Sequence, residues 1–247
     1  SHDLGQNFAK AFDWTVQDEK GEKLFPHQNS WGFSTRSIGG LIMVHGDDSG
    51  LVLPPAIAPV QVVIVPIPGS SSKVFDYAKE LADLLKKKEI RVVLDLEENE
   101  SAGFKFNKWE LKGVPLRIEI GEKEMKLDKL TVAIRYNHEK KEISAEEVSG
   151  LLDEIQKVMF EAHRKFTEDH TYQLNQLDKF DKFKEIMKTT KGFLKAFWCE
   201  NKVCEEKIKE ETKASTRCLP LDAKEESGQC IYCQKPATHR WLFAQAY

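Results

Sequence analysis

The sequence lacks the long apolar segment that a membrane-spanning helix needs. No apolar run in its 247 residues approaches the roughly 18 residues of such a helix. The opening, SHDLGQNFAK, has neither the basic nor the apolar region of a secretory signal. Positive charge is not in excess either, because 37 Lys and Arg stand against 40 Asp and Glu. These absences argue against a membrane protein, a secreted protein and a nonspecific nucleic-acid coat, and we expect a cytoplasmic protein. A local basic face stays open.

Cysteine is scarce, and its number is odd. Five cysteines without a secretory signal favour thiols or metal ligands over a disulfide framework. Four of them form close pairs, namely Cys199 with Cys204 and Cys230 with Cys233, and 25 residues lie between the pairs. Two such pairs can supply four thiolates to a tetrahedral Zn²⁺, which leaves no position for a substrate water, so the predicted zinc site is structural. The alternatives are four unrelated buried thiols, or His239 as a substitute ligand.

The sequence divides into three zones that differ in composition and in hydrophobic pattern. Residues 1–58 are rich in Gly, Ser and aromatic side chains, and we expect GLIMVHG and GLVLPP to form two short buried strands joined by an acidic turn. Residues 59–168 combine β-branched runs with helical patterns. Residues 169–247 contain the paired cysteines and end in HRWLFAQAY, a predicted strand.

The middle zone predicts a small α/β domain with a mixed sheet. VQVVIVPI is a predicted strand, a helical pattern then continues to about Glu89, and IRVVLDL is a second strand, so residues 60–96 are expected to form a βαβ unit with parallel strands. After a predicted loop, VPLRIEI and LTVAIRY follow as strands. Ser144 and Glu147 form a capping box that opens a helix through about Asp169.

The last zone predicts two helices and a supporting metal. A first helix is marked by apolar residues at helical spacing, namely Leu177, Phe180, Phe183, Ile186 and Met187, and EEKIKEETK predicts a second. The last roughly 50 residues have little apolar content, so metal binding is expected to supply part of their folding energy. Cys218, which lies between the pairs, is interpreted as a packed free thiol.

Three parts of the sequence resemble the prolyl-tRNA synthetases, a family of class II enzymes. SWGFSTRSIGGLIMVHGDDSGLVLPPAIAPVQVVIVPI resembles their third signature motif, and FKFNKWELKGVPLRIEIG resembles their anticodon-binding domain. The cysteine pairs and the terminal Tyr247 resemble the zinc-binding extension of the archaeal and eukaryotic-type enzymes. The resemblance covers essentially the whole chain. It implies the end of an antiparallel class II catalytic sheet at 1–58, an α/β anticodon-binding domain at 59–168 and a small α+β zinc-binding domain at 169–247.

The resemblance also implies a function. A proline–tRNA ligase uses ATP and Mg²⁺ to activate L-proline as prolyl-adenylate and then transfers proline to tRNA(Pro). Because the first two class II motifs should lie upstream, the chain is interpreted as the C-terminal half of a homodimeric enzyme, inactive without its other half. The alternatives are a non-catalytic tRNA-binding paralogue, against which the Arg36 motif argues, and a zinc-stabilised interaction domain.

The resemblance assigns catalytic-site roles to a few residues. Arg36, expected on a strand, matches the motif-three arginine that can stack on adenine and hold a phosphate oxygen. Ser34 matches a position that touches the nucleotide, and His2 and Trp31 are expected to line the proline pocket. Tyr247 is expected to fold back so that its carboxylate orders the active site, or to anchor the last strand. For Arg36 the ordinary alternative is a salt bridge at a strand end.

Anticodon bases are expected to contact a second group of residues. Single-stranded bases are recognised on their edges, and a carboxylate such as that of Glu110 can accept hydrogen bonds from guanine. The predicted set consists of Asp95, Glu110, Lys112 and Arg117, with Phe106 and Asn107 as neighbours. The ordinary alternative is a loop ion pair between Glu110 and Lys112, which contributes little in water.

Overall fold

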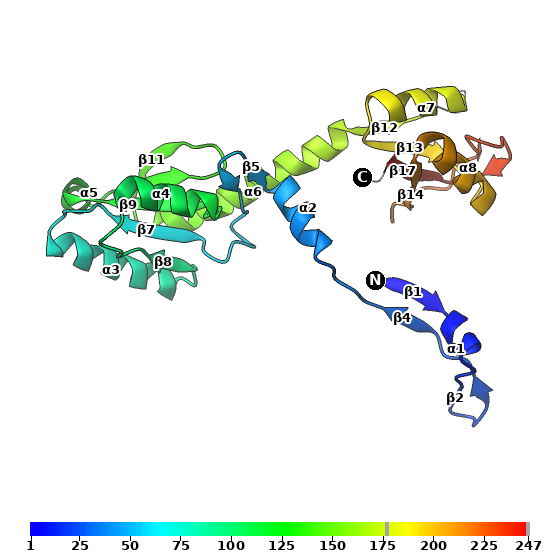
Figure 1. Ribbon diagram of the computed structural model, residues 1–247, viewed down its shortest axis with the longest axis horizontal. Coiled ribbons are helices and arrows are strands. Elements are labelled where there is room, and N and C mark those ends of the chain that lie inside the picture. The colour runs from blue at the N-terminus through cyan, green and yellow to red at the C-terminus, as the bar shows by residue number, and fades with distance from the viewer. Residues whose placement is uncertain (176–177, 246–247) are drawn as a thin grey trace. The chain divides into compact units, whose positions relative to one another are not determined.

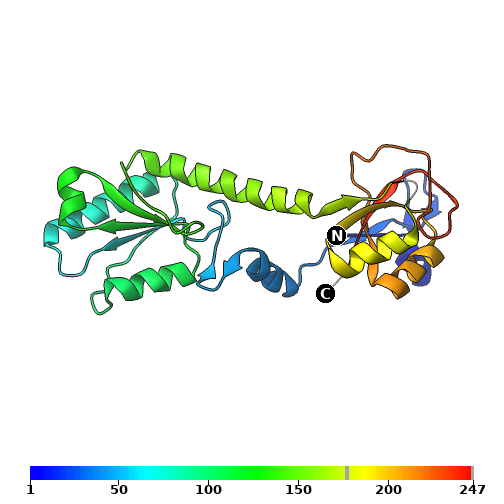
Figure 2. The same cartoon turned by 90° about the horizontal axis from the view of Figure 1, so that it is seen from above.

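The computed structural model describes residues 1–175 and 178–245 (Figure 1). Leu177 and Tyr247, which carried predictions, lie outside the described residues. The chain forms two compact units, Ser1–Asp153 and Glu154–Tyr247. The boundary falls within the 23-residue helix α6 (Glu147–Asp169), which Figure 2 shows as one continuous helix. No described helix combines the length and apolar character needed to cross a membrane.

The first unit begins with short strands and a helix. Strand β1 (His2–Gly5) pairs antiparallel with β4 (Gln28–Ser30). Between these strands lie α1 (Asn7–Ala11), β2 (Val16–Gln17) and β3 (Lys23–Leu24). They are followed by α2 (Arg36–Val44) and by a hairpin of β5 (Gly46–Asp47) and β6 (Gly50–Leu51).

Helix α2 overturns the prediction of a buried strand over GLIMVHG. Ile38, Leu41 and Ile42 recur at helical spacing, so this apolar run has the period of a helix rather than of a strand. The Ser37 hydroxyl donates to the Ser34 carbonyl oxygen at 2.6 Å, which stabilises the first turn. Arg36 is therefore the first residue of a helix, and Ser34 lies in the segment before it rather than on a strand with it.

The α/β part of the first unit is built on a five-stranded mixed sheet of order β11-β10-β9-β7-β8. Its elements are β7 (Val62–Pro66), α3 (Ser72–Lys87), β8 (Val92–Leu94), α4 (Ala102–Leu111), β9 (Leu116–Ile120), α5 (Glu122–Leu127), β10 (Leu130–Ile134) and β11 (Lys140–Ile143). Strand β7 runs parallel to β8 and β9, whereas β10 is antiparallel to β9 and β11. The predicted βαβ unit and mixed sheet are confirmed.

The burial of each strand follows its position in this sheet. Every residue of β7, an internal strand between β9 and β8, is buried, as expected for a strand covered on both faces. Strands β9 and β10 alternate between buried and half-buried residues, and the predicted strand VPLRIEI buries its alternate residues Val114, Leu116, Ile118 and Ile120. The Glu147 carboxylate accepts the Ser144 backbone N–H at 2.7 Å, as the capping box requires, and α6 ends at Asp169 as predicted.

Helix α4 replaces the loop that was expected before β9. Its N-terminus is capped by Ser101, whose side chain accepts the backbone N–H of Phe104 at 3.3 Å. Gly113 follows its C-terminus with a φ of +72°, the left-handed conformation in which glycine commonly ends a helix. Both signals are present in the sequence SAGFKFNKWELKG. The predicted loop was therefore wrong, although the sequence contained the start and stop signals of a helix.

The second unit is an α+β fold around a four-stranded sheet of order β12-β13-β17-β14. Its elements are β12 (Thr171–Gln173), α7 (Phe180–Thr189), β13 (Phe193–Phe197), α8 (Lys202–Thr212), β14 (Ala214–Cys218), β15 (Gly228–Gln229), β16 (Pro236–Ala237) and β17 (Arg240–Gln245). Phe183 and Phe243 are fully buried in its core, with ring centroids 5.3 Å apart. The predicted helices over 180–187 and 205–213 and the predicted last strand are confirmed within the described residues.

Candidate functional sites

A small pocket of about 80 Å³ opens beside the C-terminal end of α4. Helix α4 contributes two lining residues, and the others come from β9 and the segment before it, from β10 and the turn after it, and from the start of β11. The lining residues are Trp109, Glu110, Val114, Arg117, Ala133, Ile134, Arg135, His138 and Lys140. The structure thus brings Glu110 and Arg117 together, as the sequence predicted.

The pocket combines one carboxylate with several cations and an aromatic face. The Glu110 carboxylate lies 3.5 Å from His138 Nδ1, and its side chain is 24% exposed. Arg117 lies over the Phe106 ring, with its guanidinium carbon 4.1 Å from the ring centroid. Both Arg117 and Lys140 contact the Glu119 carboxylate, at 2.9 Å each. A planar ligand with donors on one edge and acceptors on another matches this arrangement, because both kinds of partner line one concave surface.

Lys112 does not line the pocket, although Glu110 does. It follows the end of α4, and its ammonium lies 4.5 Å from the centroid of the Trp109 ring, within the range of a cation–π interaction. Glu110 lies in the last turn of the helix, beside His138. The loop ion pair considered for Glu110 and Lys112 is therefore replaced by two separate contacts.

Asp95 is buried and bonded to α4 rather than facing the pocket. Its carboxylate lies 2.8 Å from Lys108 Nζ and 3.4 Å from Lys105 Nζ, and it accepts the Trp109 indole N–H at 2.6 Å. Burial acts to raise the pKa of Asp95, but the hydrogen bonds from Lys108 and Trp109 outweigh it and lower that pKa to about 2. Asp95 thus anchors the helix that carries Glu110.

His2 and Trp31 meet at the start of the chain. The pairing of β1 with β4 places His2 opposite Ser30, next to Trp31. Both line a shallow open depression, together with Ser1, Asp3, His27, Gln28 and Asn29. Ser34 and Arg36 do not line it; both are exposed at the start of α2.

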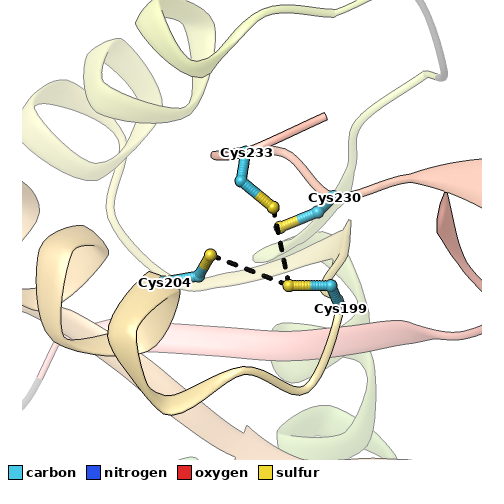
Figure 3. A group of neighbouring side chains, drawn as sticks. All are labelled: Cys199, Cys204, Cys230 and Cys233. Carbon is cyan, nitrogen blue, oxygen red and sulfur yellow. Dashed lines mark hydrogen bonds between the residues drawn. The ribbon is translucent and has the colours of Figure 1, made fainter. Parts of the chain in front are cut away.

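The four paired cysteines converge on one point of the second unit (Figure 3). Cys199 follows β13, Cys204 lies in the first turn of α8, and Cys230 and Cys233 lie in the turn after β15. All four sulfur atoms lie within 4.8 Å of one another, and the Cys199 sulfur is 3.7 Å from that of Cys204 and 3.6 Å from that of Cys233. Four thiolates at Zn–S bonds of about 2.3 Å place neighbouring sulfurs about 3.8 Å apart. The cluster fits a tetrahedral metal ion.

The ionisation of the cluster is uneven. Burial raises the pKa values of the Cys199 and Cys204 thiols. Burial also acts to raise the pKa of Cys233, but the backbone N–H of Lys235 and the neighbouring thiols lower it to about 7. The turn that carries Cys233 therefore stabilises a thiolate, the form that binds metal.

His239 and Cys218, the other two residues considered in this region, do not take the positions that the sequence analysis considered for them. His239 is not in the cluster, and its Nδ1 lies 3.0 Å from the Thr238 hydroxyl. Cys218 is exposed rather than packed, so that prediction was wrong. It ends β14 after an irregularity in the pairing with β17, between Thr216 and Cys218, and the core of this unit is filled by other side chains.

The pocket residues that the sequence analysis missed come mainly from one turn. Arg135, His138 and Lys140 follow β10, which ends at Ile134. Arg135 lies within the predicted strand LTVAIRY, whereas His138 and Lys140 lie beyond it, and β11 was not predicted. The segment RYNHEKK contains Asn137 and a His138 with a φ of +58°, which are typical of a turn between two strands. That turn signal, placed after an alternating strand, could have indicated a hairpin at the mouth of a pocket.

Comparisons with known proteins agree with both units. Residues 61–155 match the family described as anticodon binding domain, and residues 180–247 match the family described as prolyl-tRNA synthetase, C-terminal. The proline–tRNA ligase of Alkaliphilus oremlandii is 45% identical over 251 residues, which cover 100% of this chain and 52% of that protein. The corresponding ligase of Flavobacterium johnsoniae is 44% identical over 254 residues, covering 100% of the chain and 51% of the relative.

Solved structures give the same result. A crystal structure of the prolyl-tRNA synthetase from Cryptosporidium parvum with L-proline and AMP has a TM-score of 0.86 at 38% identity, covering 100% of this chain and 54% of that one. A second structure of that protein, with halofuginone and AMPPNP, has a TM-score of 0.87 and is covered to 53%. The chain thus spans about half the length of the relatives it matches.

The mixed-sheet domain with its pocket, followed by the cysteine-cluster domain, has the organisation of a class II aminoacyl-tRNA synthetase region that includes an anticodon-binding domain. Within that class, the chain corresponds over its whole length to the C-terminal region of the prolyl-tRNA synthetases.

Proposed function

We propose that this chain is the C-terminal region of a proline–tRNA ligase, which activates L-proline with ATP and Mg²⁺ and transfers it to tRNA(Pro). The observation that carries the proposal is the likeness along the entire chain, at 38% identity, to a prolyl-tRNA synthetase solved with L-proline and AMP. Adenylate formation requires positioned reactants and neutralised phosphate charge, with no covalent intermediate on the protein. The proposed roles below assign those tasks to single residues.

Arg36 and Ser34 are proposed to bind ATP. Both are exposed at the start of α2, where the helix dipole favours negative charge. The guanidinium of Arg36 offers a planar face for adenine and a fork of donors for a phosphate oxygen. His2 and Trp31, which share one depression, are proposed to form part of the proline pocket.

The pocket beside α4 is proposed to recognise an anticodon base. The Glu110 carboxylate can accept hydrogen bonds from the N1 and N2 groups of a guanine, while Arg117 and Lys140 can donate to its O6 and N7 acceptors. Lys112, at the neighbouring surface, is proposed to contact RNA near this base. Asp95 is proposed to act through α4, because its carboxylate is bonded inside the domain.

The cysteine cluster is proposed to hold a structural zinc ion. Cys199, Cys204, Cys230 and Cys233 would fill a tetrahedral coordination sphere, so the metal would stabilise the fold without binding substrate. The enzyme is proposed to act as a homodimer, with an interface outside this chain.

Amino-acid-dependent ATP–pyrophosphate exchange by the full-length protein tests the function. Each standard amino acid is assayed, with Arg36→Ala and, as a matched control, Lys20→Ala in the exposed turn between β2 and β3. We expect exchange with proline alone, lost in Arg36→Ala and retained in Lys20→Ala. Exchange with no amino acid would move the function to a non-catalytic tRNA-binding paralogue.

A further inference from the structure

The β5–β6 hairpin docks tightly on the base pocket from outside the matched anticodon-binding domain. A Cβ atom on Gly50 would lie 2.5 Å from the Leu111 Cα, and one on Gly113 would lie 2.7 Å from the Leu51 carbonyl carbon. The Leu53 backbone N–H donates to the Gly113 carbonyl oxygen at 3.3 Å. The hairpin, at residues 46–51, and the end of α4 therefore approach each other so closely that neither glycine has room for a side chain.

One buried arginine joins the hairpin to the helix at this contact. Arg135, which is 5% exposed, donates from its two terminal nitrogens to the two carboxylate oxygens of Asp47, at 2.8 and 2.5 Å. Its Nε donates to the backbone carbonyl oxygen of Glu110 at 3.2 Å. A single planar guanidinium thus fixes Asp47 and the last turn of α4 with respect to each other.

A histidine on the pocket wall lies between the same two acidic residues. His138 Nε2 is 3.9 Å from the Asp47 carboxylate, and His138 Nδ1 is 3.5 Å from the Glu110 carboxylate. Glu110, Arg135 and His138 all line the pocket, whereas Asp47 does not. Asp47 therefore contacts two pocket-lining residues, Arg135 and His138, without lining the pocket itself.

We propose that Asp47 is a positioning residue for anticodon recognition: through Arg135 and His138 it sets the place of the Glu110 carboxylate in the pocket. This inference rests on the proposed role of the pocket in reading the anticodon. Its physical basis is that the Asp47 carboxylate accepts hydrogen bonds from both fork nitrogens of the buried Arg135. When Asp47 loses its charge, the guanidinium lacks this counter-charge, and the carboxylate among the residues that line the same pocket is that of Glu110.

A role in stability alone would give a different result from a role in positioning. The Asp47 side chain is 37% exposed, so the ion pair itself contributes modestly to the free energy of unfolding. If Asp47 only stabilised the hairpin, the folded variant would still distinguish a correct anticodon from an altered one. If Asp47 positions Glu110, that discrimination falls even at temperatures where the variant is fully folded.

Binding of RNA to the 247-residue chain tests the proposal. The probes are an anticodon stem-loop RNA with the proline anticodon and the same RNA with one anticodon guanine replaced by adenine. Fluorescence anisotropy gives the ratio of the two Kd values, and circular dichroism confirms that each variant is folded. We expect Asp47→Asn to reduce this ratio by about tenfold, the effect of losing one charged hydrogen-bonding arrangement. Asp48→Asn, in the same turn and exposed, should leave the ratio unchanged.

Two further variants make the result decisive. Arg135→Lys keeps the positive charge but cannot bond Asp47 and the Glu110 carbonyl together, so it should also lower the ratio, and it decides the matter if Asp47→Asn does not fold. Glu110→Gln tests the pocket itself. A lowered ratio in Glu110→Gln with an unchanged ratio in Asp47→Asn and Arg135→Lys overturns the positioning role alone. An unchanged ratio in Glu110→Gln overturns the assignment of the pocket.

Discussion

At the scale of single residues, the carboxylate of Asp95 fixes α4, whose C-terminal end lines the pocket. Lys105, Lys108 and Trp109 all reach it from α4, and its own side chain is 4% exposed. Lys105 is as buried as Asp95, at 3%. A charged group of this kind is stable inside a protein only while its partner is present, because an unpaired buried charge is costly.

Replacing Asp95 with asparagine should therefore lower the free energy of unfolding by about 3 kcal/mol, the typical cost of breaking a buried ion pair. The amide can still accept from Trp109, but it leaves the Lys105 ammonium without a counter-charge. Urea unfolding of the 247-residue chain measures the effect. Glu98→Gln, an exposed acidic residue three positions along, serves as the control and should change stability little. Equal stability of the two variants would contradict this account.

Acid should destabilise the first unit because it protonates the carboxylates of Asp47 and Asp95. Hydrogen bonds from Arg135 lower the pKa of Asp47 to about 2, and burial of Asp95 is outweighed by its partners, which lower its pKa to about 2. Both values lie below the ordinary value of about 4 for aspartate, so the stabilisation is complete above that pH and is lost as pH falls from about 4 to about 2.

For Asp95 this loss corresponds to about 2 kcal/mol in the free energy of unfolding. Urea midpoints recorded from neutral pH down to pH 2 should fall less steeply for Asp95→Asn than for the unchanged chain. Parallel curves would show that Asp95 is not the titrating group.

At the scale of elements, the close contact between the β5–β6 hairpin and α4 depends on glycine. Gly50 has a φ of +130°, and a Cβ there would lie 2.5 Å from the Leu111 Cα. Gly50→Ala should therefore cost more than about 2 kcal/mol, since it combines backbone strain with overpacking. Gly150→Ala, within α6 and with nothing within 4 Å of the added Cβ, should instead stabilise the chain by about 0.5–1 kcal/mol. Chemical denaturation measures both, and a neutral Gly50→Ala would contradict the packing.

The cysteine cluster gives a second prediction at this scale. The chain should bind about one zinc ion, and Cys230→Ser should abolish zinc binding because Cys230 is fully buried in the cluster. Elemental analysis of purified protein measures the metal, with the exposed Cys218→Ser as the matched control. Zinc retained in Cys230→Ser, or lost in Cys218→Ser, would contradict the proposed set of zinc ligands.

How far the sequence predicted these elements depends on how local their causes are. The βαβ unit, the alternating β9 and β10 and the capping box of α6 are fixed by periodicity and caps, and all were predicted. The helix α2 was missed because its apolar run, LIMV, is short and continuous. Such a run does not distinguish a helix from a buried strand. The contact of Asp47 with Arg135 was not predictable, because it joins residues 88 positions apart. Glu110 and Arg117 were found only through the resemblance of the surrounding motif.

At the scale of the whole molecule, the two units have separate hydrophobic cores. Phe183, Leu194 and Phe243 are fully buried in the core of Glu154–Tyr247, whereas the core of Ser1–Asp153 is centred on strand β7. Units with separate cores unfold as separate cooperative transitions. The four cysteines of the cluster all belong to the second unit.

Calorimetry of the zinc-loaded chain should therefore show two transitions. A chelator that removes zinc should lower the temperature of only one of them, since metal bound to the native cluster stabilises only the unit that contains it. Limited proteolysis after chelation identifies the weakened unit, which should be Glu154–Tyr247. A single transition that shifts as a whole would show instead that the two units unfold together.

The backbone contact between Gly50 and Leu111 has a consequence for anyone who builds chimeric synthetases. A transplant that begins at residue 61, where the anticodon-binding family match starts, would leave the hairpin behind and put a foreign loop against α4. A foreign loop with a side chain at the position of Gly50 would collide with the helix, and one without an acidic residue at position 47 would leave Arg135 unpaired. The smallest portable module that keeps this backbone contact and the Asp47–Arg135 ion pair thus starts at Gly46, fifteen residues before the recognised domain.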